Sequence, residues 1–159
     1  MPRKVTVALQ RTIPADRKYQ SVLVQRLINK SMLNGKKLLA ERSVYEALEI
    51  AAKKLKNENP LEVFEKALKN ISPNFEVKSR RVGGSNYQIP FPIQGHRQLH
   101  YAFSWLVQSA RGRHGASYPQ CLALEIVDAY NEAGGAFKKK EDTHKMAEAN
   151  RAFAHFARS

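Results

Sequence analysis

The sequence predicts a mainly α-helical fold of six helices, with a projecting β-hairpin and a basic, flexible N-terminal arm. Apolar residues recur at helical spacing over most of the chain. One stretch instead alternates with period two, and residues 1–16 are basic and show no period. No repeat or long linker divides residues 17–159, so we expect a single helical domain after an extension of residues 1–16.

Helix signals mark the ends of several predicted segments. Asn34-Gly35 stops the first helix because glycine tolerates the left-handed conformation, and Gly134-Gly135 should end the fifth in the same way. Asn59-Pro60 begins the third helix as a cap followed by a proline. The predicted helices cover about 17–33, 36–55, 60–71, 99–110, 118–133 and 139–156, the last with Met146, Ala149, Phe153 and Phe156 along one face.

The hairpin is predicted at about residues 75–93. Apolar and polar residues alternate on both sides of Gly83-Gly84, and two glycines between alternating runs favour a tight β-turn. Pro90 and Pro92 lie in the returning strand, and prolines are confined to edge strands. A two-stranded ribbon has only edges, so these prolines fit a projecting arm.

The charge balance predicts a polyanionic partner. Lys and Arg total 27 against 14 Asp and Glu, giving a net charge of +13. Binding to nucleic acid is driven by release of counterions from each neutralised phosphate, which makes RNA or DNA the favoured partner. The apolar runs are too short to span a membrane or to form a signal-peptide core, so we expect no membrane partner and function where the chain is made.

Candidate catalytic patterns fail on their spacing. Residues 34–37 lack the first glycine and the Ser or Thr of a phosphate-binding loop. His144 and Glu148 share a helical face but not the His-Glu-x-x-His order of a zinc protease, so an exposed polar face is the simpler interpretation. No Gly-x-Ser-x-Gly elbow occurs, and the single cysteine, Cys121, fits a small buried residue. We therefore predict no enzyme activity, no cofactor and no metal site.

The basic residues form five clusters, on the arm, at the start of the second helix, on the hairpin, in a predicted loop at 111–115 and at the start of the predicted last helix. One cluster alone would fit a merely solvated face. Five in such places suit several RNA backbone strands better than one groove-reading helix. The predicted RNA-contacting residues are Arg3, Lys4, Arg11, Arg17, Lys18, Lys36, Lys37, Lys78, Arg111, Arg113, Lys138, Lys139 and Lys140.

Three segments resemble one protein family. Residues 77–85 (VKSRRVGGS) are similar to the hairpin of the seventh protein of the bacterial small ribosomal subunit. Residues 139–156 (KKEDTHKMAEANRAFAHF) resemble the last helix of that family, and residues 34–37 (NGKK) match its early glycine–lysine signature. Order and spacing agree from about Arg17 to the end of the chain.

The resemblance implies a non-catalytic ribosomal protein. Members of this family bind the 3′ major domain of small-subunit rRNA, nucleate assembly of the subunit head and touch the neighbouring eleventh protein. By the same resemblance, the hairpin tip lies near the exit-site tRNA and the mRNA path. The tip residues are Arg80, Arg81, Gly83, Gly84 and Ser85.

Residues 94–100 and 117–120 depart from the usual bacterial pattern, with less arginine after the hairpin. These departures are similar to organelle-encoded members, so the sequence favours a plastid ribosome slightly over a bacterial one. Two other classes stay open. A nucleic-acid binder that works off the ribosome would sediment apart from ribosomes, and an enzyme acting on RNA would show nuclease activity with added divalent metal.

Overall fold

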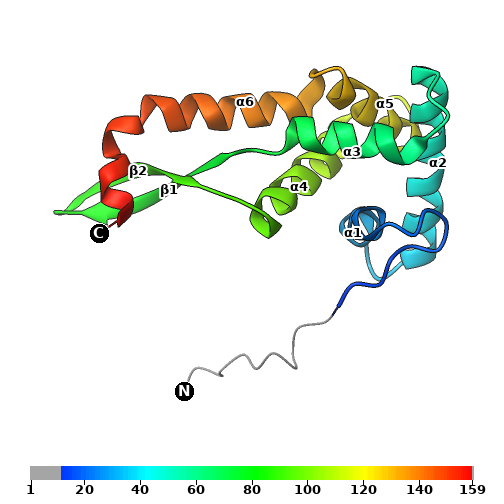
Figure 1. The fold of residues 1–159 in the computed structure, drawn as a ribbon, viewed down its shortest axis with the longest axis horizontal. Coiled ribbons are helices and arrows are strands. Elements are labelled where there is room, and N and C mark those ends of the chain that lie inside the picture. Colours follow the sequence, from blue (N-terminus) through cyan, green and yellow to red (C-terminus); the bar gives the residue numbers. More distant parts are fainter. Residues whose placement is uncertain (1–11, 159) are drawn as a thin grey trace.

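The computed structural model describes residues 12–158, which form six α-helices and a hairpin inserted after the third helix (Figure 1). The elements are α1 (Val22–Ser31), α2 (Lys37–Leu55), α3 (Pro60–Ile71), β1 (Phe75–Val82), β2 (Ser85–Pro92), α4 (His96–Gly112), α5 (Tyr118–Tyr130), α6 (Gly134–Ala149) and the 3-10 helix η2 (Arg151–Arg158). The predicted fold class is confirmed. Arg3, Lys4 and Arg11 of the predicted arm lie outside the described residues.

Helix α5 lies at the centre of the helical core. It packs against α2, α3, α4 and α6, and its residues Leu122 and Ile126 are fully buried. Phe64 of α3 and Phe103 of α4 meet in the same core, with ring centroids 6.4 Å apart. A helix surrounded in this way needs apolar residues on nearly all sides, which α5 supplies.

Helix α3 begins and packs as predicted. The Asn59 side chain accepts a hydrogen bond from the Leu61 backbone N–H at 3.1 Å, which satisfies one of the donors that a helix start leaves unpaired. Further along, Phe64, Leu68 and Ile71 are buried at helical spacing. The side of the helix that they form lies in the core.

The hairpin also follows the prediction. Strands β1 and β2 pair in antiparallel register, with Arg80 opposite Tyr87, and Gly83 and Gly84 form the turn. Both glycines have positive φ angles, 57° and 90°, as the tight two-residue turn between twisted strands requires. Figure 1 shows the ribbon extending away from the other helices, with α6 running alongside it.

The C-terminal 3-10 helix supports this ribbon. The Tyr87 ring lies 5.1 Å from the Phe153 ring and 5.6 Å from the Phe156 ring, measured between centroids. The Arg80 guanidinium donates a hydrogen bond of 2.9 Å to the Phe156 carbonyl. The ribbon and η2 therefore pack as one projecting unit.

The predicted role of Gly134-Gly135 is wrong. Helix α5 ends at Tyr130, and the glycines begin α6 instead of ending α5. Gly134 has a φ of +88°, and a Cβ atom added to it would lie 2.9 Å from the Cβ of Asp128. The glycines are therefore required because α6 starts in close contact with α5 at Gly134 and with Ser109 of α4 at Gly135, and not because a helix stops there.

The predicted last helix, 139–156, is wrong at both ends. Helix α6 starts earlier, at Gly134, and ends at Ala149, after which the chain tightens into η2. Met146, expected on the apolar face, is 51% exposed, whereas Ala147 is buried. The turn at Asn150 places the aromatic residues of η2 against the ribbon. The apolar residues of α6 and η2 therefore do not form one continuous helical face.

The first helix starts later than predicted, at Val22. The side chain of Asp16 accepts hydrogen bonds from the backbone N–H groups of Lys18, Tyr19 and Ser21 at 2.8–3.0 Å. Asp16 is 3% exposed and also accepts from the Tyr45 hydroxyl. These bonds hold residues 17–20 in a non-helical turn. Extending α1 back to Arg17 would break them.

Candidate nucleic-acid interface

Acidic residues are distributed unevenly along the chain. Residues 17–40 and 77–124 contain no Asp or Glu, whereas each segment carries six Lys and Arg residues. Helix α1 belongs to the first segment and α4 to the second, and the two helices pack against each other. The fold thus brings parts of the two segments together at α1 and α4, and we call residues 17–40 and 77–124 the acid-free region. Phosphate groups approaching it meet cations without competing carboxylates in the same segments.

The start of α2 is an open basic site of this region. Lys36 and Lys37 are exposed, and the first turn of the helix contains no acidic side chain. Asn34 and Gly35 adopt positive φ angles of 51° and 72°, which turn the chain sharply into the helix. The unpaired N–H groups and the dipole of a helix N-terminus add to the attraction of the lysines for phosphate.

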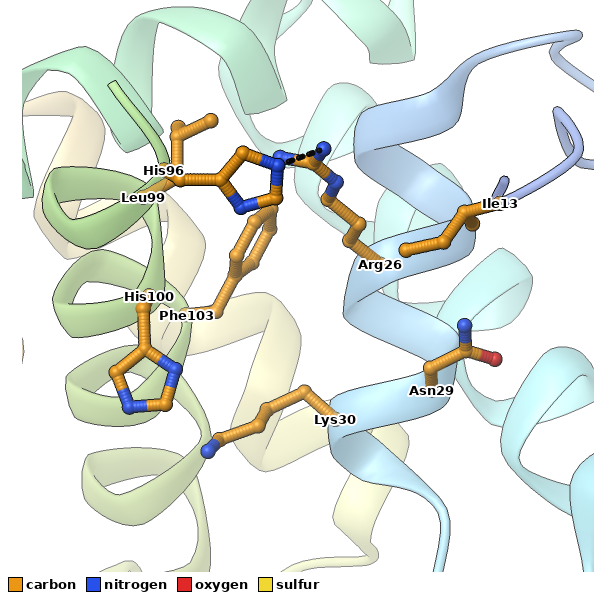
Figure 2. Close-up of a pocket in the computed structure, with 8 residues that line it drawn as sticks. All are labelled: Ile13, Arg26, Asn29, Lys30, His96, Leu99, His100 and Phe103. Carbon is orange, nitrogen blue, oxygen red and sulfur yellow. Dashed lines mark hydrogen bonds between the residues drawn. The ribbon is translucent and has the colours of Figure 1, made fainter. Parts of the chain in front are cut away.

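A groove between α1 and α4 holds functional groups that were not predicted (Figure 2). Arg26 and Lys30 line it from α1, and His96 and His100 line it from α4. Each pair is spaced by four residues, so its members share one helical face. No basic run marks these residues in the sequence. The signal that points to them is the lack of acidic residues in both helices.

Three predicted RNA-contacting residues are engaged in ion pairs within the protein. Lys18 pairs with Glu49, and Lys78 pairs with the buried carboxylate of Glu76 at 2.8 Å. Both lysines stay about half exposed, so phosphate can still reach them.

Arg113 is held more firmly than the two lysines. Its guanidinium contacts both Glu125, at 2.6 Å, and Asp128, and its side chain is only 29% exposed. Partial burial works to lower the pKa of Arg113, but hydrogen bonds to Asp128 and Glu125 outweigh it and raise that pKa. The structure thus gives Arg113 a structural contact and lends no support to its predicted RNA contact.

Other predicted residues donate hydrogen bonds to uncharged groups. Arg111 reaches the Ser31 carbonyl at 3.1 Å, Lys140 the Asn70 carbonyl at 2.6 Å, and Lys139 the Gln108 side chain at 2.9 Å. Arg111 also belongs to the last turn of α4, not to the predicted loop 111–115. Because these partners carry no charge, the cations keep their attraction for phosphate.

Five predicted residues are exposed and form no ion pair or side-chain hydrogen bond with other residues in the part of the chain that the structure describes. They are Arg17, Lys36, Lys37, Arg81 and Lys138. Lys138 to Lys140 lie within α6 and are followed by Glu141 and Asp142, so this cluster is less positive than the start of α2. Gly83, Gly84 and Ser85 are exposed at the tip of the ribbon.

The described part of the chain was also compared with the requirements of a metal centre. Residues 12–158 bring together no group of three His, Cys, Asp or Glu side chains that could hold a metal ion. His144, weighed above as part of a metal-binding helix, accepts a hydrogen bond of 3.0 Å from the Asn74 backbone N–H. Burial, together with nearby Lys140, lowers the pKa of His144, which favours the neutral ring that this bond needs. The described helices also include none long and apolar enough to cross a membrane.

A helical core, a projecting ribbon and an acid-free region define a structural protein of the nucleic-acid-associated class. Comparison with known proteins identifies the family. A model of the family described as ribosomal protein S7p/S5e matches residues 2–151. The small ribosomal subunit protein uS7 of Chloroflexus aggregans is 54% identical over 158 residues, covering 99% of both chains. The proteins of the same name from Thermomicrobium roseum and Dictyoglomus turgidum are 54% and 52% identical over 156 residues, 98% of this chain and 99% of theirs.

The chain belongs to the ribosomal protein S7p/S5e family. It is a structural constituent of the small ribosomal subunit and not an enzyme. The expectation of a plastid source is corrected, because these relatives are bacterial proteins. Similarity at residues 94–100 and 117–120 to organelle-encoded members was too local a signal to outweigh the rest of the chain.

Proposed function

We propose that this protein binds the 3′ major domain of small-subunit rRNA through the acid-free region and thereby nucleates assembly of the subunit head. The observation that carries the proposal is the packing of α1 against α4, which joins two segments without acidic residues. Several RNA strands can then be held at α1, α4 and the start of α2. The extension of residues 1–16 would add contacts through Arg3, Lys4 and Arg11.

The ribbon has a different proposed role. Its tip is exposed and carries Arg81 but no large apolar residue that the helical core needs. In line with the family resemblance, we place the tip near the exit-site tRNA and the mRNA, while another face meets the eleventh small-subunit protein. A long ribbon braced by η2 suits contact with RNA at a distance from the nucleating site.

The salt dependence of RNA binding tests the proposal. Affinity for a fragment of the 3′ major domain should fall steeply as salt rises, and a 5′-domain fragment should bind more weakly at every salt concentration. Lys36→Ala and Lys37→Ala should each reduce the slope of log affinity against log salt by about one, because each removes a phosphate contact.

Lys54→Ala is the matched control, since Lys54 is exposed on the same helix but outside the acid-free region. Its slope should equal that of the unaltered protein. Equal binding of the two RNA fragments would contradict the assignment to the 3′ major domain. If Lys36→Ala, Lys37→Ala and Lys54→Ala share one slope, the start of α2 is not part of the interface.

A further inference from the structure

The groove between α1 and α4 combines a cationic wall, a wall of two imidazoles and an apolar floor. Figure 2 shows Arg26 and Lys30 on one side and His96 and His100 on the other, with Phe103 between them. Phe103 is 4% exposed, whereas Lys30 and both imidazoles are exposed to solvent. The groove therefore offers charge, planar rings and apolar surface within one small space.

The groove has no acidic side chain in its lining, and neither helix that forms it contains one. Arg26 lacks its usual carboxylate partner here. One of its terminal nitrogens meets His96 Nε2 at 3.2 Å, and its buried Nε has no hydrogen-bond partner among the described residues. Buried donors are normally paired, so an unpaired Nε–H marks a guanidinium without its full set of acceptors. Nε itself is covered by protein atoms, so a phosphate would meet the terminal nitrogens of Arg26, whose side chain lines the groove.

We propose that this groove binds one unpaired nucleotide of the RNA, with its phosphate between Arg26 and Lys30 and its base against His100 and Leu99. The inference rests on the proposed RNA-binding function and names a specific site within it. Unpaired bases are commonly recognised by stacking on aromatic, imidazole or guanidinium planes. His96 would face the sugar–phosphate from the other wall.

The size of the groove selects a single nucleotide over a duplex. Its volume is about 280 Å³, near the lower end of pockets that enclose small ligands. A base-paired strand presents its phosphates on a rigid surface and keeps its bases stacked inside, so it could not reach Leu99. The groove is also continuous with the acid-free region, which favours RNA over an acidic peptide as the occupant.

The test measures the affinity of the full chain for a 3′-major-domain fragment. His100→Ala should weaken binding about 5- to 150-fold, the range for loss of one stacked base, and leave the salt slope unchanged. Lys30→Gln should instead reduce the slope by about one, because it removes a phosphate contact. Ultraviolet crosslinking should attach a nucleotide to the peptide that contains His96 to Phe103.

Two control variants match these changes. His155→Ala removes an exposed imidazole outside the acid-free region, and Lys54→Gln removes an exposed lysine outside it. Both should bind as the unaltered protein does, and all four variants should keep its melting midpoint, since the altered side chains are exposed. A fragment in which every nucleotide is paired should give no crosslink in the groove.

The outcomes separate this proposal from the function on which it rests. If the unaltered protein shows no salt-dependent preference for the 3′ major domain, the proposed function fails. If it shows that preference but His100→Ala and Lys30→Gln behave like their controls, only the groove proposal fails. Equal occupancy of the groove by a polyglutamate peptide, measured by competition against the RNA crosslink, would also overturn it.

Discussion

At the residue scale, three carboxylates of this strongly basic protein are buried and hold neighbouring segments in place through hydrogen bonds. Asp16, Glu76 and Glu125 are each at most 4% exposed. Each accepts hydrogen bonds from groups in its own turn or from distant elements, so the cost of burying the charge is offset by charge-assisted bonds. Acidic groups placed in this way shape the fold and do not repel RNA at the surface.

Glu125 shows how much one such group should contribute. It accepts from the Ala136 backbone N–H at 2.7 Å and from Arg113 Nε at 2.7 Å, which ties α5 to the start of α6 and the end of α4. Glu125→Ala leaves both donors unpaired, so we expect a loss of roughly 3–5 kcal/mol in unfolding free energy, measured with urea. Glu141→Ala, an exposed change on α6, should stay within about 0.5 kcal/mol of the unaltered protein. Equal effects would mean that the Glu125 contacts are not stabilising.

Glu76 makes the base of the ribbon sensitive to acid. Burial alone would raise the pKa of Glu76, but hydrogen bonds from Lys78, Arg97 and Tyr101 outweigh burial and hold that pKa below its ordinary value. The folded state therefore favours the ionised form. The resulting stability is present above the ordinary carboxyl pKa of about 4.3 and is lost as pH falls through the lower, folded value.

We therefore expect unfolding free energy to drop between pH 6 and pH 3.5 by less in Glu76→Gln than in the unaltered protein. Urea unfolding at the two pH values measures this difference. The comparison isolates Glu76 because all other carboxyl groups are common to both proteins. An identical drop in both would show that Glu76 gains nothing from its three partners.

At the scale of elements, the sequence predicted what local chemistry decides. The cap at Asn59 and the alternation around Gly83-Gly84 act within a few residues, and both predictions are confirmed. The start of α6 was predicted wrongly because Gly134 is required by close contact with Asp128 of α5. Such a tertiary contact cannot be inferred from the spacing of residues along the sequence. The start of the first helix was also predicted too early, because the Asp16 side chain binds the backbone N–H groups that a helical turn would otherwise use.

Helix α3 offers a direct test of a predicted stripe. Leu68 is 3% exposed and belongs to the main apolar core. Leu68→Ala removes buried side-chain volume and leaves a cavity, so we expect a cost of roughly 2–5 kcal/mol and a lower melting midpoint. Leu38→Ala is the control, because Leu38 is 70% exposed on α2. An unchanged midpoint for Leu68→Ala would mean that this side of α3 carries little of the core.

At the scale of the whole molecule, the candidate interface could be predicted only in part. The lysines at the start of α2 form a local cluster, and the structure leaves them exposed. Arg113 also belongs to a basic cluster in the sequence. Its carboxylate partners, Glu125 and Asp128, contact it only when α5 is folded against it. Arg26 and His96 are 70 residues apart and meet only because α1 packs on α4. Charge composition identifies the partner class, while tertiary packing decides which charges remain available.

The molecule has two parts with different structural demands, a packed helical core and a ribbon braced by η2. Arg80 and Tyr87 hold η2 against the ribbon, whereas residues 81–86 beyond them are mostly exposed. Short ribbons add little stability of their own in water. Folding should therefore not depend on the tip, and its contribution should appear in the assembled ribosome.

Shortening the tip tests this division. Because Arg80 is paired with Tyr87, replacing residues 81–86 by Asn-Gly closes a two-residue turn between them. Two residues are removed from each strand, so the alternation of side chains between the two faces is kept.

We expect unchanged helical circular dichroism and normal subunit assembly, because the removed side chains lie outside the core. Exit-site tRNA occupancy or reading-frame accuracy should change, because the proposed contact with the moving RNAs is lost. Unfolding of the shortened protein would disprove the independence of the tip, and ribosomes identical to the parent in both assays would disprove its proposed location.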